Sequence, residues 1–278
     1  MTTAPSSWPE RTGGQALIDQ LRVQGVERLT CVPGESYLAA LDALYDTGVE
    51  VISCRNEGGA AIMAEAYGKL TGRPGVCFVT RGPGATNASH GVHIAMQDST
   101  PMILFIGQVD RAMREREAFQ EIDYRAMFGG IAKWVVEIDS AARVPELVAR
   151  AFRVAMQGRP GPVVIALPED MLVETCQVPD APRVEPAVAW PAPADMDRLA
   201  ALLADAKRPL AILGGSGWDE AACAAFARFA ERAQLPVATS FRRASLFDAD
   251  HPNYAGDLGI GPDAKLKARV AQADLILL

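Results

Sequence analysis

The sequence predicts an α/β protein with a doubly wound, parallel six-stranded sheet in its first domain, followed by an incomplete Rossmann-like second domain. Two observations carry this prediction. Short apolar runs of strand length alternate with Ala-rich segments of helical length. A proline-rich stretch then separates two such alternating regions. The alternation is typical of parallel strands that are buried on both faces by helices.

The first domain is expected over residues 15–172, after a flexible tail at residues 1–14. Its strands are expected at six apolar runs, 28–32, 51–54, 76–79, 102–106, 133–138 and 162–167. Helices are expected at 15–24, at 36–45, after the second and third strands, and at 144–157. Residues 110–127 are more charged and predict an ordered loop with one short helix.

Residues 173–194 are rich in proline and predict an extended linker. The second domain, 195–278, is expected to contain helices at 195–206, 219–234 and 263–271 and strands at 209–213, 236–240 and 274–278. A βαβαβ unit is only half of a doubly wound domain, and an apolar edge strand favours association. We therefore expect the chain to be part of a longer protein.

Composition narrows the classes of function. The net charge of −7 argues against nucleic acid or an anionic membrane as the main partner, and no apolar run is long enough to span a bilayer. The five cysteines are scattered without a C-x-x-C pair, which favours reduced thiols in a cytoplasmic protein. The three histidines are not arranged like metal ligands.

One carboxylate, Glu57, begins the helix after the second predicted strand. Ligands of parallel sheets bind at the carboxyl ends of the strands, and Gly58 and Gly59 allow close approach to the backbone. The apolar residues that follow are expected to bury Glu57 and raise its pKa, since burial disfavours the charged form. The alternative is that Glu57 is only an acid favoured by a helix N-terminus.

The loop after the third predicted strand has the same glycine-rich character. Its Gly82-Pro83-Gly84 sequence predicts a tight turn, and Thr86 or Asn87 is expected to cap the following helix.

Several separated motifs resemble the N-terminal half of thiamine-diphosphate-dependent enzymes, nearest to the acetolactate synthase large subunits. They are RNEGGAAIMAEAYGKLTGRPGVCFVTRGPGATN, DSTPMILFIGQV, AFQEID and GRPGPVVIALPED, in this order. The resemblance implies an enzyme that uses thiamine diphosphate with Mg²⁺ to decarboxylate a 2-keto acid such as pyruvate and to ligate the carbanion to a second carbonyl. It also implies a homo-oligomer, a dimer or tetramer, with the active site between subunits.

The resemblance also implies roles for individual residues. A family glutamate hydrogen-bonds the cofactor pyrimidine and favours the imino tautomer that removes the C2 proton, and Glu57 matches it. The catalytic candidates are Glu57 and Gln120. The cofactor-binding candidates are Pro33, Glu57, Thr80, Pro83 and Asn87. The substrate-lining candidates are Glu35, Ser36, Phe119 and Lys133. The family's GDG…N segment for Mg²⁺ is absent from the sequence, so no metal ligand is assigned and the chain alone is expected to be inactive and to associate.

Some residues depart from the acetolactate synthase pattern. Glu35 stands where small residues are usual, and Arg81 replaces the usual serine before Gly82. These departures leave open another thiamine-diphosphate decarboxylase or a benzaldehyde-lyase-like carboligase. Residues 241–245 replace the stretch that contacts FAD, which argues against FAD, although the glycine-rich turn at 214–217 remains. That turn also leaves open a dinucleotide-binding or assembly module with no catalytic role.

Overall fold

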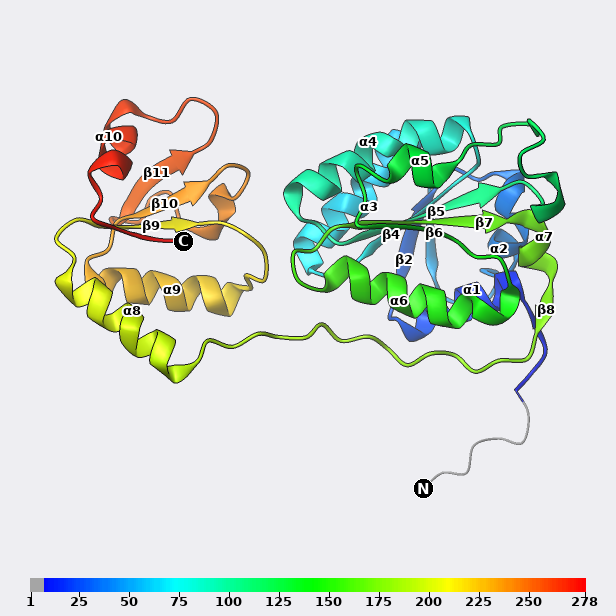
Figure 1. Cartoon of the computed structure of the whole chain (residues 1–278), viewed down its shortest axis with the longest axis horizontal. Helices are drawn as coiled ribbons and strands as arrows, with labels where there is room; N and C mark the ends of the chain where they lie inside the picture. The colour runs from blue at the N-terminus through cyan, green and yellow to red at the C-terminus, as the bar shows by residue number, and fades with distance from the viewer. Residues whose placement is uncertain (1–7) are drawn as a thin grey trace, which may run out of the picture. The chain divides into compact units, whose positions relative to one another are not determined.

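The computed structural model of the chain describes residues 8–278 and divides into two compact units, residues 1–187 and residues 188–278 (Figure 1). Residues 1–7 of the expected tail lie outside the described residues. Each unit contains its own parallel sheet, which confirms the predicted fold class. Among the described residues, no helix combines the length and apolar character that crossing a membrane requires.

The first unit contains the predicted six-stranded sheet, with strand order β3-β2-β4-β5-β7-β6 and parallel pairing throughout. The strands are β2 Arg28–Cys31, β3 Glu50–Ser53, β4 Gly75–Val79, β5 Met102–Gln108, β6 Trp134–Glu137 and β7 Pro162–Pro168. Every residue of β4, β5 and β7 is buried. Burial on both faces explains why these strands are continuous apolar runs rather than alternating ones.

Helices cover both faces of this sheet (Figure 1). The helices are α1 Gly13–Val23, α2 Leu38–Asp42, α3 Glu57–Thr71, α4 Pro83–Asp98, α5 Tyr124–Phe128, α6 Val144–Met156 and α7 Glu169–Val173. One core joins the sheet to α1, α2, α6 and α7, and the other joins it to α3, α4 and α5. Along β5, Ile103 and Phe105 belong to the first core, whereas Leu104 and Ile106 belong to the second, as the two-residue period of a strand requires.

The strand order creates a switch point between β2 and β4. After β2 the chain passes through α2 to β3 on one side, and after β4 it passes through α4 to β5 on the other. The two loops therefore diverge from adjacent strand ends, which is where doubly wound sheets bind their ligands. Three short 3₁₀ helices, η1 Glu35–Tyr37, η2 Arg111–Met113 and η3 Ala141–Arg143, lie in the connections of this unit.

Both expected boundaries of the first domain need correction. Strand β1, Arg11–Thr12, pairs antiparallel with β8, Thr175–Cys176, so the ordered unit starts before residue 15 and continues beyond residue 172. The fully buried side chains of Gln20 and Gln24 hydrogen-bond the backbone of residues 181–184. Backbone groups of the expected linker are thereby satisfied against α1, and Val184 joins the core.

The second unit has a four-stranded parallel sheet with strand order β11-β10-β9-β12. Its elements are α8 Pro193–Asp205, β9 Pro209–Leu213, α9 Glu220–Ala233, β10 Val237–Ser240, η4 Ala244–Leu246, β11 Tyr254–Leu258, α10 Ala264–Gln272 and β12 Leu275–Leu277. Strand β11 was not predicted from the sequence. This strand has no apolar run, its Gly256 has φ of +121°, and its pairing with β10 contains a register shift.

Candidate functional site

Glu57 lies in the first turn of α3, directly after the carboxyl end of β3. Asn56 caps this helix, and its Oδ1 accepts hydrogen bonds from the backbone N–H groups of Gly58 (2.9 Å) and Gly59 (3.3 Å). The cap satisfies amide groups that the first turn of a helix leaves without partners. It therefore fixes the position from which the Glu57 side chain extends.

The Glu57 carboxylate is paired with an amide from the neighbouring helix. Asn87 Nδ2 on α4 donates to Glu57 Oε2 at 2.9 Å. The expectation that Thr86 or Asn87 caps α4 is wrong, because the cap residue is Gly82 and the helix begins at Pro83. The Asn87 side chain is therefore available to bind Glu57.

The surroundings of Glu57 differ from the expected apolar enclosure. Ala60 and Ala61 are buried, but Glu57 is only half-buried and Met63 on the same helix is exposed. Within the described residues, Oε2 accepts a hydrogen bond and no donor is found for Oε1. One carboxylate oxygen is thus accessible to a ligand.

The loops at the switch point meet directly. The Ser36 and Thr80 hydroxyl oxygens lie 2.9 Å apart, and they belong to the loops after β2 and β4. A Cβ atom at Gly84 would lie 2.9 Å from Thr80 Cγ2 and 3.6 Å from Glu57 Oε1. Glycine therefore keeps open the space between Thr80 and the carboxylate, whereas Pro33 is exposed at the start of its loop.

Gln120 lies beside the same loop. It has φ of +65°, and a Cβ atom at Gly82 would lie 2.8 Å from Gln120 Cβ. Gly82 itself has φ of +58°, a conformation that favours glycine, and its N–H donates to the Tyr124 hydroxyl oxygen at 3.0 Å. Burial raises the pKa of Tyr124 to about 12, so this hydroxyl stays protonated at neutral pH.

A pocket of about 500 Å³ joins this turn to α4. Its lining residues are Gly82, Pro83, Thr86, Asn87, Gln120, Glu121 and Ile122. The structure thus brings together Glu57, Asn87, Pro83 and Gln120 around the start of α4, and Phe119 is exposed beside them.

Lys133 does not join this group. It directly precedes β6, at the amino end of the parallel sheet, whereas Glu57 follows the carboxyl end of β3. Its Nζ donates to the carbonyl oxygens of Val154 and of Gln157 (2.8 Å), and burial lowers its pKa. Within this chain Lys133 thus binds the end of α6, and its expected place among the substrate-lining residues stays a prediction.

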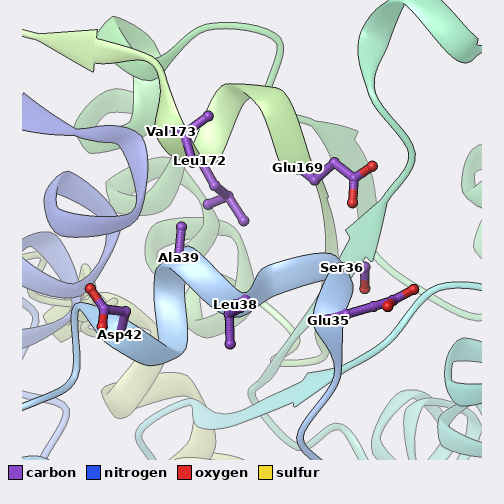
Figure 2. A pocket seen from close by; sticks show the side chains of 8 residues that line it. All are labelled: Glu35, Ser36, Leu38, Ala39, Asp42, Glu169, Leu172 and Val173. Carbon is purple, nitrogen blue, oxygen red and sulfur yellow. The ribbon is translucent and has the colours of Figure 1, made fainter.

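A second pocket of about 480 Å³ is lined by residues of η1, α2 and α7 (Figure 2). Glu35, Ser36 and Glu169 stand at one end of it and Asp42 at the other, with Leu38, Ala39, Leu172 and Val173 between them. Glu35 and Ser36 were predicted to line a substrate site, whereas no role was predicted for Glu169. Its position directly after β7, in the motif GRPGPVVIALPED, was the available signal.

Neither metal nor disulfide chemistry is evident in the part of the chain that the structure describes. No group of three or more His, Cys, Asp or Glu side chains that could hold a metal ion is found in residues 8–278. Cys31, Cys54, Cys77, Cys176 and Cys223 are all free thiols. In the second unit, the turn after β9 is held by its own side chains, since Trp218 Nε1 donates to Gly214 O at 2.8 Å.

Comparisons with known proteins agree with this geometry. Residues 11–127 match the family described as "Thiamine pyrophosphate enzyme, N-terminal TPP binding domain", and residues 196–278 match "Thiamine pyrophosphate enzyme, central domain".

Relatives from several organisms are named as acetolactate synthases or their large subunits. The acetolactate synthase isozyme 2 large subunit of Escherichia coli is 35% identical over 95% of this chain and 48% of the relative. The acetolactate synthase of Bacillus subtilis is 34% identical over 99% and 49%. A probable acetolactate synthase large subunit of Methanocaldococcus jannaschii is 34% identical over 95% and 46%. The chain spans about half the length of the curated relatives it matches.

Proposed function

Because the chain belongs to the thiamine pyrophosphate enzymes, whose N-terminal and central domains match it in order, we propose that it supplies the pyrimidine side of a thiamine diphosphate site. The complete protein would decarboxylate a 2-keto acid and ligate the product to a second carbonyl compound. The observation that carries this proposal is the hydrogen-bonded pair of Glu57 and Asn87 at the carboxyl edge of the sheet.

The residues near Glu57 fit the pyrimidine part of the cofactor. The absence of a side chain at Gly84 leaves space beside Glu57 Oε1, and this oxygen has no donor among residues 8–278. Thiamine diphosphate supplies the electron sink for carbanion chemistry when it is bound. Glu57 would hold a proton at the pyrimidine N1′ atom, Asn87 would orient the carboxylate, and Thr80 and Pro83 would line the pocket, with Pro33 at its rim.

The diphosphate part of the cofactor does not fit the described residues. Mg²⁺ prefers oxygen ligands, commonly carboxylates together with phosphate oxygens, and no suitable cluster occurs in residues 8–278. We therefore propose that another part of the complete protein, or a second subunit, holds Mg²⁺ and the diphosphate. Phe119 and Gln120 lie on an exposed turn from which they could contact substrate in such an assembly.

The charged residues near Ser36 favour keeping a second candidate reaction. Glu35 and Glu169 both pair with Arg81 at one end of the pocket in Figure 2. Two carboxylates against one guanidinium leave a net negative charge there, which would disfavour a second anionic keto acid as acceptor. A decarboxylase or a carboligase that accepts a neutral aldehyde is therefore the alternative, and product analysis with pyruvate alone and with pyruvate plus benzaldehyde would separate the reactions.

The test of the main proposal is Glu57→Gln in the complete protein with thiamine diphosphate and Mg²⁺. Loss of a positioned proton-transfer group is expected to slow hydrogen–deuterium exchange at the cofactor C2 by about 10²–10⁴-fold. The matched control is Glu65→Gln, two turns further along α3, where Oε1 accepts from Thr100 Oγ1 at 2.9 Å and an amide oxygen can replace it. Near-normal exchange in Glu57→Gln would remove Glu57 from this role.

A further inference from the structure

Arg81 connects four loops at the carboxyl edge of the first sheet. It follows β4, and its Nε donates to Phe119 O at 3.2 Å in the loop after β5. Its Nη2 lies 3.0 Å from Glu35 Oε1 after β2, and its Nη1 lies 3.3 Å from Glu169 Oε2 after β7. One guanidinium group thus contacts the segments that follow three other strands.

The burial of these groups is unequal. The Arg81 side chain is 8% exposed, whereas those of Glu35 and Glu169 are 75% and 46% exposed. Exposed carboxylates contribute little through an ion pair, because water screens them. The Phe119 carbonyl oxygen accepts from Arg81 Nε, and this is the contact that links the Arg81 side chain to a particular backbone position.

The segment that Arg81 contacts has an unusual backbone. Glu115, Glu117 and Gln120 all have φ between +54° and +65°, a region that non-glycine residues rarely adopt. Such conformations persist only where the surroundings impose them. Within the segment, the Glu121 carboxylate accepts from the N–H groups of Glu115 (2.8 Å) and Ala118 (3.3 Å). The contact from Arg81 joins this self-bonded turn to the sheet.

We propose that Arg81 is a positioning residue that fastens the Phe119–Gln120 turn against Gly82 through the fork geometry of its guanidinium. Gln120 then stays in the pocket that Asn87 and Pro83 line. Glu35 and Glu169 are exposed counter-ions of the guanidinium and contribute little to this positioning. The consequence for turnover rests on the proposed function of Gln120, whereas the positioning itself concerns only this chain.

The direct test measures amide hydrogen exchange of the 278-residue chain. Arg81→Met preserves side-chain length and leaves no buried unpaired charge, because Glu35 and Glu169 are accessible to water. Amide exchange in peptides covering residues 115–121 is expected to accelerate by about tenfold or more. The reason is that loss of the Arg81 contact lowers the free energy of local opening of this segment. Peptides of β4 and β5 are expected to exchange as in the wild type.

Two further variants separate the effect of the planar guanidinium geometry of Arg81 from the effect of its positive charge. Arg81→Lys retains the charge but loses the planar fork, so it is expected to release the turn almost as much as Arg81→Met. Glu35→Gln leaves the contact from Nε to Phe119 O intact and is expected to exchange within about twofold of the wild type, since the pair is exposed. Unchanged exchange at 115–121 in Arg81→Met, full protection in Arg81→Lys, or equal acceleration in β4 and β5 would each overturn the proposal.

The complete protein provides the functional readout. In Arg81→Met, kcat/KM for the keto acid is expected to fall by about 10²-fold, the loss that a misplaced group of about 1 Å can cause. The Kd for thiamine diphosphate is expected to stay within about twofold, because the Arg81 side chain contacts Glu35, Phe119 and Glu169 and makes no contact with Glu57 or Asn87. Faster amide exchange at residues 115–121 with unchanged turnover would show that Arg81 positions the turn but that Gln120 has no part in the reaction. The proposal about Arg81 and the proposed role of Gln120 can therefore fail separately.

Discussion

Helices α3 and α4 carry Glu57 and Asn87, and the distance between the helices depends on one glycine. Gly91 of α4 faces α3, and a Cβ atom there would lie 2.5 Å from Ala61 Cβ, 2.7 Å from Ala61 C and 2.9 Å from Ile62 N. Two of these three atoms belong to backbone and cannot rotate away. Gly91→Ala must therefore move the helices apart by about 1 Å to reach ordinary van der Waals separation.

The expected cost follows from two opposing effects. Overpacking of a well-packed core costs about 1–3 kcal/mol, and more where the clash involves backbone. Replacing glycine with alanine inside a helix stabilises the helix by about 1 kcal/mol, because alanine has the higher intrinsic helix propensity. We expect the clash to exceed the propensity gain, so that Gly91→Ala destabilises the first unit by about 1–2 kcal/mol.

The matched control is Gly59→Ala on α3, where a Cβ atom would meet nothing within 4 Å. This change is expected to be neutral or to stabilise the first unit by up to about 1 kcal/mol. Urea unfolding of the 278-residue chain, followed by far-UV circular dichroism at equal m-values, measures both variants. A Gly91→Ala midpoint equal to or above that of Gly59→Ala would refute the conclusion that Gly91 sets the helix separation.

Two other predictions follow from charged groups. Partial burial opposes ionisation of Asp170, but hydrogen bonds and charge from Arg111, with Nε–Oδ2 at 2.6 Å, hold the pKa of Asp170 below its usual value. This stabilisation is therefore present above the unfolded-state pKa of about 3.9 and is lost as pH falls through the lower folded-state pKa. Asp170→Asn should be less stable than the wild type at neutral pH, with the difference vanishing in acid; a pH-independent difference in urea midpoint would contradict this. Separately, the 278-residue chain should bind thiamine diphosphate with Mg²⁺ only weakly, because residues 8–278 contain no cluster of three or more His, Cys, Asp or Glu side chains for the metal ion. Each charge-assisted bond that is lost with the metal ion costs about 1.5–3 kcal/mol. Micromolar affinity in calorimetry would show that a diphosphate site is present after all.

The sequence predicted most of the first domain because its strands are unusually clear signals. Buried parallel strands such as β5 and β7 are continuous apolar runs, and each is followed by a helix or a polar loop. Strand β11 carried no such signal, since Tyr254–Leu258 contains a glycine and an aspartate and only partly buried residues. The ends of the first domain were missed because β1 and β8 are two-residue strands, which only their mutual pairing defines.

The candidate site was predictable as a set of loops but not as a set of contacts. Glu57 and Asn87 follow β3 and β4, which are successive along the chain but separated by β2 in the sheet, and a resemblance to known motifs singled both out. Their hydrogen bond depends on the close packing of α3 and α4. Lys133 does not lie beside Glu57, because a resemblance gives a position along the chain but does not say at which edge of the sheet that position lies. The parallel direction of β6 places it at the amino edge.

Arg81 illustrates a contact that no local pattern could have predicted. In the sequence it is a basic residue before a Gly-Pro-Gly turn, for which exposure to solvent would be the ordinary expectation. Its burial arises because the strand order β2-β4-β5-β7 places the ends of four strands side by side, so that Glu35, Phe119 and Glu169 surround one guanidinium group. These partners are separated from Arg81 by 46, 38 and 88 residues. The topology of the sheet, rather than the neighbouring sequence, therefore determines which loops Arg81 can hold together. A substitution of Arg81 should accordingly increase amide exchange in the turn after β5 more than in β4 itself.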